Sequence, residues 1–357
     1  MDTSSETKPR RSTVTELARN PRSVAELRAW HGLREEETLE PGLPIIDPHH
    51  HLWIRPGQRY LLDEFLEDAS SGHNARATVF VECGAMYKAS GPQAVRPVGE
   101  TEFANGMAAM SASGLYGNTA VCAGIVGFAD LTLGEAVQEV LEAHIAAGGG
   151  RFRGIRNQAA RDESLHWDKQ NPKDLLLDRR FRAGFATLAP MKLTYDAWQF
   201  FMQLGDLIDL ARAFPETTIV LNHLGGIVGV GGHEGRLAEE FPFWREHMRK
   251  LAECANVVVK VGGLAMLRAG FDAALRDEPP SSEDLAAVWR PYVETCIDAF
   301  GPQRCMFESD FPPDKQSCSY RVLWNVFKRL ARSYSADEKS ALFHDTAARV
   351  YRLSPLA

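Results

Sequence analysis

The sequence predicts a single (β/α)₈ barrel of the α/β class, preceded by an N-terminal extension. Eight short runs rich in β-branched residues follow one another between residues 45 and 310, and amphipathic helical patterns separate them. A chain of 357 residues is long enough for one large barrel. We therefore expect the extension over residues 1–43 and the barrel, as a single domain, over residues 44–357.

The extension is polar and charged and contains no strand pattern. The stretch VAELRAWHGL at 24–33 predicts one short helix, and EPGLP at 40–44 marks the turn into the first strand. We expect this segment to clasp a neighbouring subunit in a homo-dimer.

The barrel elements can be assigned in order along the chain. Amphipathic stretches at 133–148 and 201–214 predict helices, and the capping boxes SSED (281–284) and SADE (335–338) predict the starts of two more. The long connections 84–118 and 264–282 are candidate substrate-covering loops. The eight predicted strands span 45–47, 77–83, 120–128, 152–156, 192–198, 218–223, 257–263 and 305–310.

Composition and missing motifs exclude several classes of protein. The net charge of −7 argues against nucleic acid or an anionic membrane as a partner. Six cysteines without a CxxC pair favour free thiols in a reducing compartment, and no long apolar run occurs, so we expect a cytoplasmic protein. GVGGHE (229–234) lacks the last glycine of GxGxxG, and neither GxxxxGK[ST] nor GxSxG occurs. A nucleotide-binding sheet and a Ser-His-Asp hydrolase are therefore disfavoured.

Polar residues end the predicted strands, and the carboxyl ends of the strands carry the active site in such barrels. Any one of these residues has a structural explanation, but a buried charge is costly unless it is paired or functional, so their convergence predicts a site. They are His49, His50, His51, Glu82, Arg153, Arg156, Tyr195, Asp196, Asn222, His223, Lys260, Glu308 and Asp310.

The histidine run PIIDPHHHLW (44–53) is the most specific of these signals. His49 and His51 are two residues apart, so on an extended backbone they face the same side and His50 faces the other. Two imidazoles on one side suit a divalent metal or a substrate oxyanion. A structural histidine cluster is the alternative, and it is weakened by the matching His223 and Asp310.

Four separated motifs, DPHHHLW, NHLGG, FESDFPPDK and FHDTAARVYRL, resemble the amidohydrolase-related family of metal-dependent or metal-optional barrel hydrolases. The likeness runs from Ile45 to Leu353, in the branch of the sugar lactonases, sulfomuconolactonase-like enzymes and pyrone dicarboxylate lactonase. It implies a (β/α)₈ barrel that hydrolyses a small carboxylated or polyhydroxylated lactone. By this resemblance His49 and His51 match the first-strand HxH, His223 the sixth-strand histidine and Asp310 the eighth-strand aspartate.

The chain departs from the family pattern at two places. Many members carry a metal-binding lysine or histidine after strand five, whereas LTYDAWQFF (193–201) has neither. His49, His51 and Asp310 would then hold Zn²⁺ or Mn²⁺ with Glu82 or Asp196 replacing the missing ligand, or the site works without a metal. The branch also often shows histidine where this chain has Asn157.

Hydrolysis of a lactone needs an activated water, a polarised carbonyl and a proton for the alkoxide. We expect Asp310 to be the general base, with His49, His51 and His223 polarising the carbonyl directly or through a metal. Arg156 could instead pair with Glu82, Lys260 could form a structural ion pair, Asp196 could be a helix N-cap and Trp53 a core residue. The residues expected to contact a small, anionic substrate are Arg156, Arg153, Glu82, Tyr87, Tyr195, Asp196, Trp198 and Lys260, with Trp53.

Three other functions remain open at this point. The same barrel resembles metal-dependent decarboxylases of unsaturated or aromatic acids, although those usually keep the strand-five histidine. Amide or ester hydrolysis differs mainly in the leaving group. A catalytically silent barrel that binds a small acid would not need Asp310.

Overall fold

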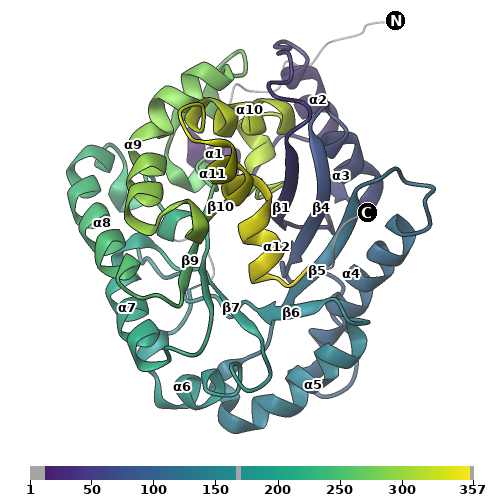
Figure 1. Ribbon diagram of the computed structural model, residues 1–357, viewed down its shortest axis with the longest axis vertical. Coiled ribbons are helices and arrows are strands. Elements are labelled where there is room, and N and C mark those ends of the chain that lie inside the picture. The colour runs from purple at the N-terminus through teal and green to yellow at the C-terminus, as the bar shows by residue number, and fades with distance from the viewer. Residues whose placement is uncertain (1–12, 166–169, 354–357) are drawn as a thin grey trace, which may run out of the picture.

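The computed structural model describes residues 13–165 and 170–353. Eight parallel strands form a nearly closed barrel with helices around it, as predicted (Figure 1). Each of the eight predicted strands is present, and they are hydrogen-bonded in chain order. They are β1 (Pro44–His50), β4 (Asn74–Val81), β5 (Ala120–Gly127), β6 (Phe152–Ile155), β7 (Thr194–Ala197), β8 (Ile219–Leu221), β9 (Val257–Val261) and β10 (Cys305–Phe307).

Helices follow the strands on the outside of the barrel. Ser281 and Ser335 accept hydrogen bonds from the backbone N–H groups of Asp284 and Glu338, which confirms both predicted capping boxes. A two-stranded hairpin of β2 (Trp53–Arg55) and β3 (Gln58–Tyr60) follows β1. The helices are α3 (Leu62–Ala69), α4 (Val98–Ser111), α5 (Val137–Ala147), α6 (Arg179–Phe185), α7 (Leu204–Ala213), α8 (Leu237–Ala252), α9 (Ser282–Phe300), α10 (Tyr320–Leu330), α11 (Ala336–Ser340) and α12 (Thr346–Val350).

Apolar side chains fill both the layer under the helices and the inside of the barrel. On α7 the predicted face of Leu204, Leu207, Ile208 and Ala211 is buried. Inside the barrel, strand residues such as Val79 and Val220 pack against the apolar residues of α12. Thr346 and Arg349 of α12 donate to backbone carbonyls of Pro302 and Gln303, which precede β10. Helix α12 therefore lies at the amino ends of the strands, and Figure 1 shows it crossing the barrel.

The first and last strands meet at the opposite, carboxyl end of the barrel. The backbone N–H of Asp310 donates to the carbonyl oxygen of His49 at 2.9 Å, and the N–H of His51 donates to that of Phe311 at 2.8 Å. Because these hydrogen bonds close the barrel, the ends of β1 and β10 are held in contact.

The extension contains α1 (Val14–Arg19) and α2 (Val24–His31), the second of which was predicted. It packs on the barrel of its own chain. Trp30 Nε1 donates to the carbonyl oxygens of Arg276 at 3.2 Å and Asp277 at 3.1 Å, and the N–H of Leu39 donates to Asn325 Oδ1 at 2.9 Å. A clasp on a neighbouring subunit remains a prediction.

The predicted substrate-covering loop at 84–118 was wrong for 98–111, because α4 occupies these residues and is the ordinary barrel helix after β4. The connection 264–282 contains only short 3₁₀ turns before α9 begins. All six cysteines are described and all are free thiols, as predicted.

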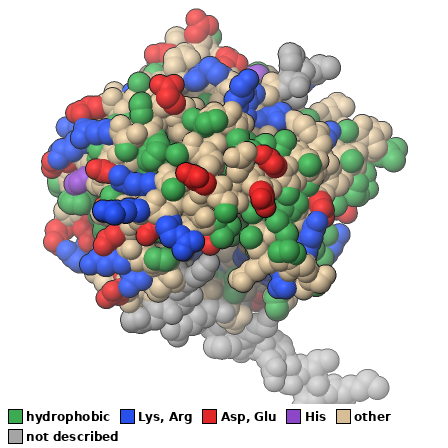
Figure 2. Space-filling model, turned by 90° about the horizontal axis from the view of Figure 1, so that it is seen from below, with side chains coloured by type: hydrophobic (Ala, Val, Ile, Leu, Met, Phe, Trp, Pro, Cys, Tyr) green, Lys and Arg blue, Asp and Glu red, His purple; other side chains and the backbone are tan. Residues whose placement is uncertain are grey.

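In the described part of the chain no helix is long and apolar enough to span a bilayer. On the face shown in Figure 2, acidic and basic side chains are interspersed.

Candidate active site

Three imidazoles converge on one carboxylate at the carboxyl end of the barrel. Oδ1 of Asp310 lies 3.6 Å from Nε2 of His49, 3.3 Å from Nε2 of His51 and 3.8 Å from Nε2 of His223. All four side chains are buried. The structure therefore brings together the four residues that were predicted to carry the chemistry, although they come from three strands far apart in the sequence.

Local backbone geometry aims two of these side chains. His223 and Asp310, two and three residues after the ends of β8 and β10, adopt left-handed φ values of 53° and 51°. Such values are rare for residues other than glycine and persist where the surroundings enforce them. Gly263 packs against His223 so closely that a Cβ there would lie 2.6 Å from Nδ1 of the imidazole. Glycine is therefore required at 263 for His223 to keep this position.

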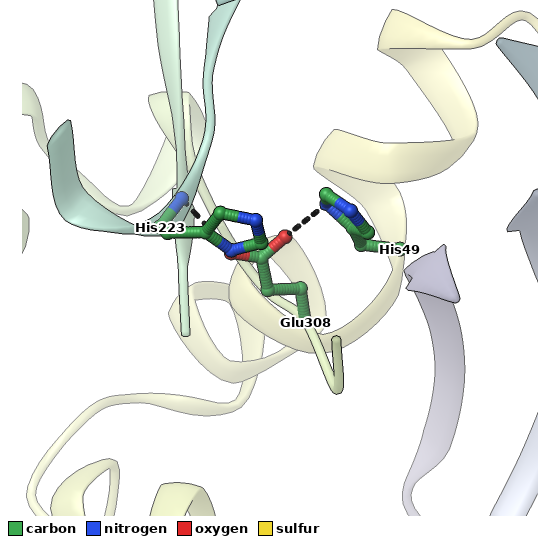
Figure 3. Close-up of side chains that lie close together, drawn as sticks. All are labelled: His49, His223 and Glu308. Atoms are coloured by element: carbon green, nitrogen blue, oxygen red, sulfur yellow. Dashed lines mark hydrogen bonds and ion pairs between the residues drawn. The ribbon is translucent and has the colours of Figure 1, made fainter. Parts of the chain in front are cut away.

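Glu308 orients two of the imidazoles, a role that was not predicted from the sequence. Its Oε2 lies 2.7 Å from Nδ1 of His49 and its Oε1 lies 2.7 Å from Nδ1 of His223 (Figure 3). The backbone N–H of His223 also donates to Oε1, at 3.0 Å. A signal was present: Glu308 and Asp310 are two residues apart at a strand end, as are His49 and His51, so they face the same side.

The partners of Nδ1 assign the tautomers. His49 and His223 are placed to donate from Nδ1 to Glu308, and His51 to the carbonyl oxygen of Val81 at 2.7 Å. Burial first, and then nearby cations, lower the pKa of His49, and burial lowers that of His51 against the opposing effect of Asp310. Neutral imidazoles with Nδ1 protonated carry a lone pair on Nε2. Two such lone pairs, those of His49 and His51, therefore face the Asp310 carboxylate.

Asp310 keeps its charge in this environment. Burial acts to raise its pKa, but His223, His51 and Arg156 outweigh burial and hold the pKa below its usual value. Its Oδ2 is buried and forms no hydrogen bond of ordinary geometry with a described residue. Asp314 lies next to it, and burial together with the charges of Asp310 and Glu308 raises the pKa of Asp314 well above its usual value.

Arg156 pairs with Glu82, as the structural alternative proposed. Its Nε lies 2.7 Å from Oε1 of Glu82, and its Nη1 lies 3.3 Å from Nε2 of His49. Glu82 also accepts from Gln158 at 2.7 Å. The predicted use of Glu82 as a metal ligand needs correction, because these donors hold it outside the group formed by His49, His51 and Asp310.

Lys260 and Asp196 form an ion pair inside the barrel, with Nζ 2.7 Å from Oδ2 and both side chains fully buried. Asp196 also accepts from Tyr351 at 2.9 Å and from Asn222 at 3.0 Å. The interpretation of Asp196 as a helix N-cap is wrong, since the residue lies within β7. Nζ of Lys260 lies 3.4 Å from Nδ1 of His49, so the ion pair packs against one of the imidazoles of the centre.

Two predicted contact residues do not reach the site. Tyr195 faces the helix layer, where its hydroxyl donates to the carbonyl oxygen of Asn157 at 2.8 Å, because neighbours on a strand face opposite sides and Asp196 points inward. Arg153 lies at the amino end of β6 and donates to the carbonyl oxygen of Gly150 at 2.6 Å. Both are corrections to the predicted pocket.

Aromatic rings cover the imidazoles. Trp53 stacks on His51 with ring centroids 5.9 Å apart and planes 18° apart, and Trp198 meets His223 edge-on at 4.8 Å. Tyr87 is 38% exposed on the loop after β4.

The middle imidazole, His50, turns away from the site as predicted and lies 2.8 Å from the hydroxyl of Thr78.

An imidazole and carboxylate centre at the carboxyl ends of the strands of a (β/α)₈ barrel defines a barrel enzyme, because these ends carry the active sites of such enzymes. Residues 46–353 match the amidohydrolase family of the Amidohydro_2 type, and the chain belongs to this family. The family resemblance of the four motifs is thereby confirmed.

Curated relatives match almost along their whole length. An uncharacterized protein of Sinorhizobium fredii is 33% identical over 337 residues, which cover 87% of this chain and 99% of the relative. An L-fucono-1,5-lactonase of Burkholderia multivorans is 29% identical over 320 residues, which cover 86% of this chain and 96% of the relative.

Solved structures share the fold. An amidohydrolase of Burkholderia multivorans with bound zinc has a TM-score of 0.66 and 27% identity, covering 87% of this chain and 99% of that one. A putative 2-pyrone-4,6-dicarboxylic acid hydrolase of Pseudomonas putida has a TM-score of 0.58 and 18% identity, covering 87% and 98%.

Proposed function

We propose that the protein hydrolyses a small lactone and that His49, His51 and Asp310 hold a divalent cation, Zn²⁺ or Mn²⁺, beside His223. The observation that carries this proposal is the convergence of three imidazole Nε2 atoms on Asp310 Oδ1 within 3.3 to 3.8 Å. The lactonase that is 29% identical and the zinc-containing amidohydrolase that is 27% identical support it.

The residues fit a cation for an electrostatic reason. The Nε2 lone pairs of His49 and His51 and a carboxylate oxygen of Asp310 face one another and attract positive charge. Arg156 Nη1 already lies 3.3 Å from Nε2 of His49, and a bound cation would add to this charge. Imidazole nitrogen and carboxylate oxygen are ligands of both Zn²⁺ and Mn²⁺. A cation bound there would act as a Lewis acid toward a carbonyl oxygen. Direct polarisation by His49 or His51 is disfavoured, because a neutral imidazole with its proton on Nδ1 has none on Nε2 to donate.

Asp310 is the general base in this proposal. Because its pKa is held below the usual value, the carboxylate is ionised at neutral pH and can accept a proton from the attacking water. Water then adds to the lactone carbonyl, the ring C–O bond breaks, and the same carboxyl group returns its proton to the departing alkoxide. The product is a hydroxy acid, and the protein ends with its starting protonation.

Neighbouring residues position this machinery. Glu308 fixes the rings of His49 and His223, so that their Nε2 atoms stay directed at Asp310. The indoles of Trp53 and Trp198 exclude water on two sides, which strengthens electrostatic interactions within the site.

The proposal is tested with Asp310→Asn in the full chain. Acid release from L-fucono-1,5-lactone and D-glucaro-1,4-lactone is measured against spontaneous hydrolysis. We expect kcat to fall by about 100- to 10,000-fold, the usual contribution of a general base. Asp209→Asn is the matched control, since Asp209 lies on α7 and pairs with Arg182.

Two results would contradict the proposal. Turnover by Asp310→Asn at the wild-type rate removes the proposed base. If the wild-type protein binds these lactones or their acids but hydrolyses neither, it is a catalytically silent barrel that binds a small acid.

A further inference from the structure

A large cavity lies between the N-terminal extension and the mouth of the barrel. Its volume is about 720 Å³, within the range of pockets for small ligands. Val14, Ala18 and Leu27 of the extension line one side, and Trp53, Met266 and Pro312 of the barrel line the other. The extension precedes the region matched by the family, 46–353, so this wall is an addition to the family barrel.

The barrel side of the cavity adjoins the candidate centre. Trp53 lines the cavity and stacks on His51, whose Nε2 faces Asp310. Pro312 also lines it and follows Asp310 by two residues. A molecule held in this cavity therefore lies one indole ring away from the proposed reacting groups.

The lining is strongly cationic. Each of its three carboxylates is already neutralised: Glu67 by Arg28, Glu64 by Arg59 and Asp68 by Lys315. Further arginines contribute to the same wall without being needed for those pairs. They are Arg55 and Arg321, whose described hydrogen bonds go to backbone carbonyl oxygens. The excess of positive charge favours an anion over a neutral ligand.

Arg55 is the arginine best placed to bind that anion. Its guanidinium lies 3.8 Å from the centre of the Trp53 ring, and one nitrogen, Nη2, donates to the carbonyl oxygen of Cys83 at 3.0 Å. Among the described residues no carboxylate forms an ion pair with it. Stacking on the indole fixes the plane of the guanidinium and leaves its N–H edge for an acceptor in that plane.

A second arginine of the cavity wall also lies over an indole that contacts the centre. The guanidinium of Arg268 lies 5.7 Å from the centre of the Trp198 ring, and Trp198 contacts His223. Arg55 lies on β2, and Arg268 lies on the connection after β9. The two cationic groups thus approach the centre from separate loops, each through one indole.

We propose that this cavity is a carboxylate subsite with Arg55 as its main anchor, so that the substrate is a lactone bearing a separate ionised carboxyl group. This inference rests on the proposed lactone hydrolysis and narrows its substrate class. It assigns the anionic end of the substrate to Arg55, because the side chain of Arg156 is held by Glu82 and Arg153 lies at the other end of β6.

The experiment compares two substrates that differ at one carbon. D-glucaro-1,4-lactone carries a carboxylate where D-glucono-1,4-lactone carries a hydroxymethyl group. In the full chain, Arg55→Gln should lower kcat/KM for the glucarolactone by about 10- to 100-fold, the loss expected for a charge-assisted hydrogen bond, mainly by raising KM. Its kcat/KM for the gluconolactone should change by less than about twofold, because no charge is recognised there.

Two further variants separate charge from geometry. Arg55→Lys keeps the charge but not the planar fork, so its loss should lie between those of the wild type and Arg55→Gln. Arg290→Gln is the control for losing one positive charge, since Arg290 lies on α9 and pairs with Glu294 at 2.8 Å. It should match the wild type on both substrates.

Binding of D-glucarate, measured by calorimetry, tests the subsite independently of hydrolysis. Weaker D-glucarate binding by Arg55→Gln, about 10-fold or more, supports the subsite even if no lactone is hydrolysed, in which case the proposed function fails alone. Hydrolysis of both lactones with unchanged substrate preference and unchanged D-glucarate affinity in Arg55→Gln overturns the subsite. So does a wild-type protein that does not bind D-glucarate.

Discussion

The backbone N–H of Asp310 donates a 2.9 Å hydrogen bond to the carbonyl oxygen of His49, which joins the last strand of the barrel to the first. The same two residues place their side chains in the candidate centre, where Nε2 of His49 lies 3.6 Å from Oδ1 of Asp310. Closing the barrel and assembling the site are therefore one structural event. The distance between the His49 and Asp310 side chains is therefore fixed by the backbone hydrogen bond between the two strand ends.

Replacing Glu308 by glutamine should reduce activity and metal affinity together. Oε1 of the carboxylate accepts from Nδ1 of His223, and Oε2 lies 2.7 Å from Nδ1 of His49. A carboxamide offers one acceptor oxygen and one donor nitrogen, so one of the two imidazoles must turn. We expect a loss of about 10- to 100-fold in kcat/KM and in zinc affinity.

Kinetics and zinc content by elemental analysis measure both effects of Glu308→Gln. Glu246→Gln, at an exposed residue of α8 paired with Lys250, is the matched control. Wild-type activity and wild-type zinc affinity in Glu308→Gln would show that this carboxylate does not orient the imidazoles.

Removing the metal should lower both activity and thermal stability. A cation that binds only the folded state stabilises it by about 2.7 kcal/mol when present at about 100 times its dissociation constant. Treatment with a chelator should therefore lower Tm, and added Zn²⁺ or Mn²⁺ should restore it. Elemental analysis before and after treatment records the loss.

The variant His51→Asn, which removes one proposed ligand, separates this effect from unspecific chelator damage. Its Tm should no longer respond to chelator or to added metal. Purified wild-type protein that contains no divalent metal and shows no shift in Tm on adding one would refute the metal site.

Much of the site was predictable because strands alternate with a period of two. That rule placed His49 and His51 on one side and turned His50 away, and the structure agrees. The same rule applies to Glu308 and Asp310, of which only Asp310 was predicted to take part in the chemistry. Applied to β7, it would have placed Tyr195 outside once Asp196 was taken to point inward.

Pairing between side chains was not predictable from one sequence. Arg156 was expected to face the substrate, but Glu82 holds it, and nothing in the local sequence of either residue distinguishes the two outcomes. The extension is a similar case. Trp30 docks on carbonyl oxygens of Arg276 and Asp277, and such backbone acceptors leave no trace in the sequence.

Lys260→Met should destabilise the fold because it leaves the buried carboxylate of Asp196 without its ion partner. Both groups are fully buried and lie 2.7 Å apart. Breaking such a pair costs about 3–5 kcal/mol of the free energy of unfolding. Urea unfolding measures this loss, and the double variant Lys260→Met/Asp196→Asn should lose less than the sum of the two single variants.

The alternative role of Lys260 as a substrate contact gives another result. In that case Lys260→Met would raise KM without changing the free energy of unfolding, and no coupling with Asp196 would appear in the double variant.

Acid should destabilise the protein through buried histidines, and His144 is the clearest case. Burial lowers its pKa from 6.5 to about 4, and it is held neutral between the hydroxyl of Thr101 at 2.8 Å and the carbonyl oxygen of Phe128 at 3.0 Å. Between these two pKa values the unfolded chain binds a proton that the folded chain does not. The contribution of His144 to the free energy of unfolding is therefore fully present above pH 6.5. It is lost as the pH drops toward 4, and the loss amounts to about 3 kcal/mol.

The variant His144→Gln removes this proton from the unfolded state. Urea unfolding between pH 4.5 and 7.5 should show a pH slope of the free energy of unfolding that is shallower than the wild-type slope by about one proton near pH 5. Since neither state is charged at this site above pH 7, the two slopes should coincide there, which serves as the internal control. Equal slopes near pH 5 would mean that His144 takes up its proton without unfolding, which its two hydrogen bonds and full burial oppose.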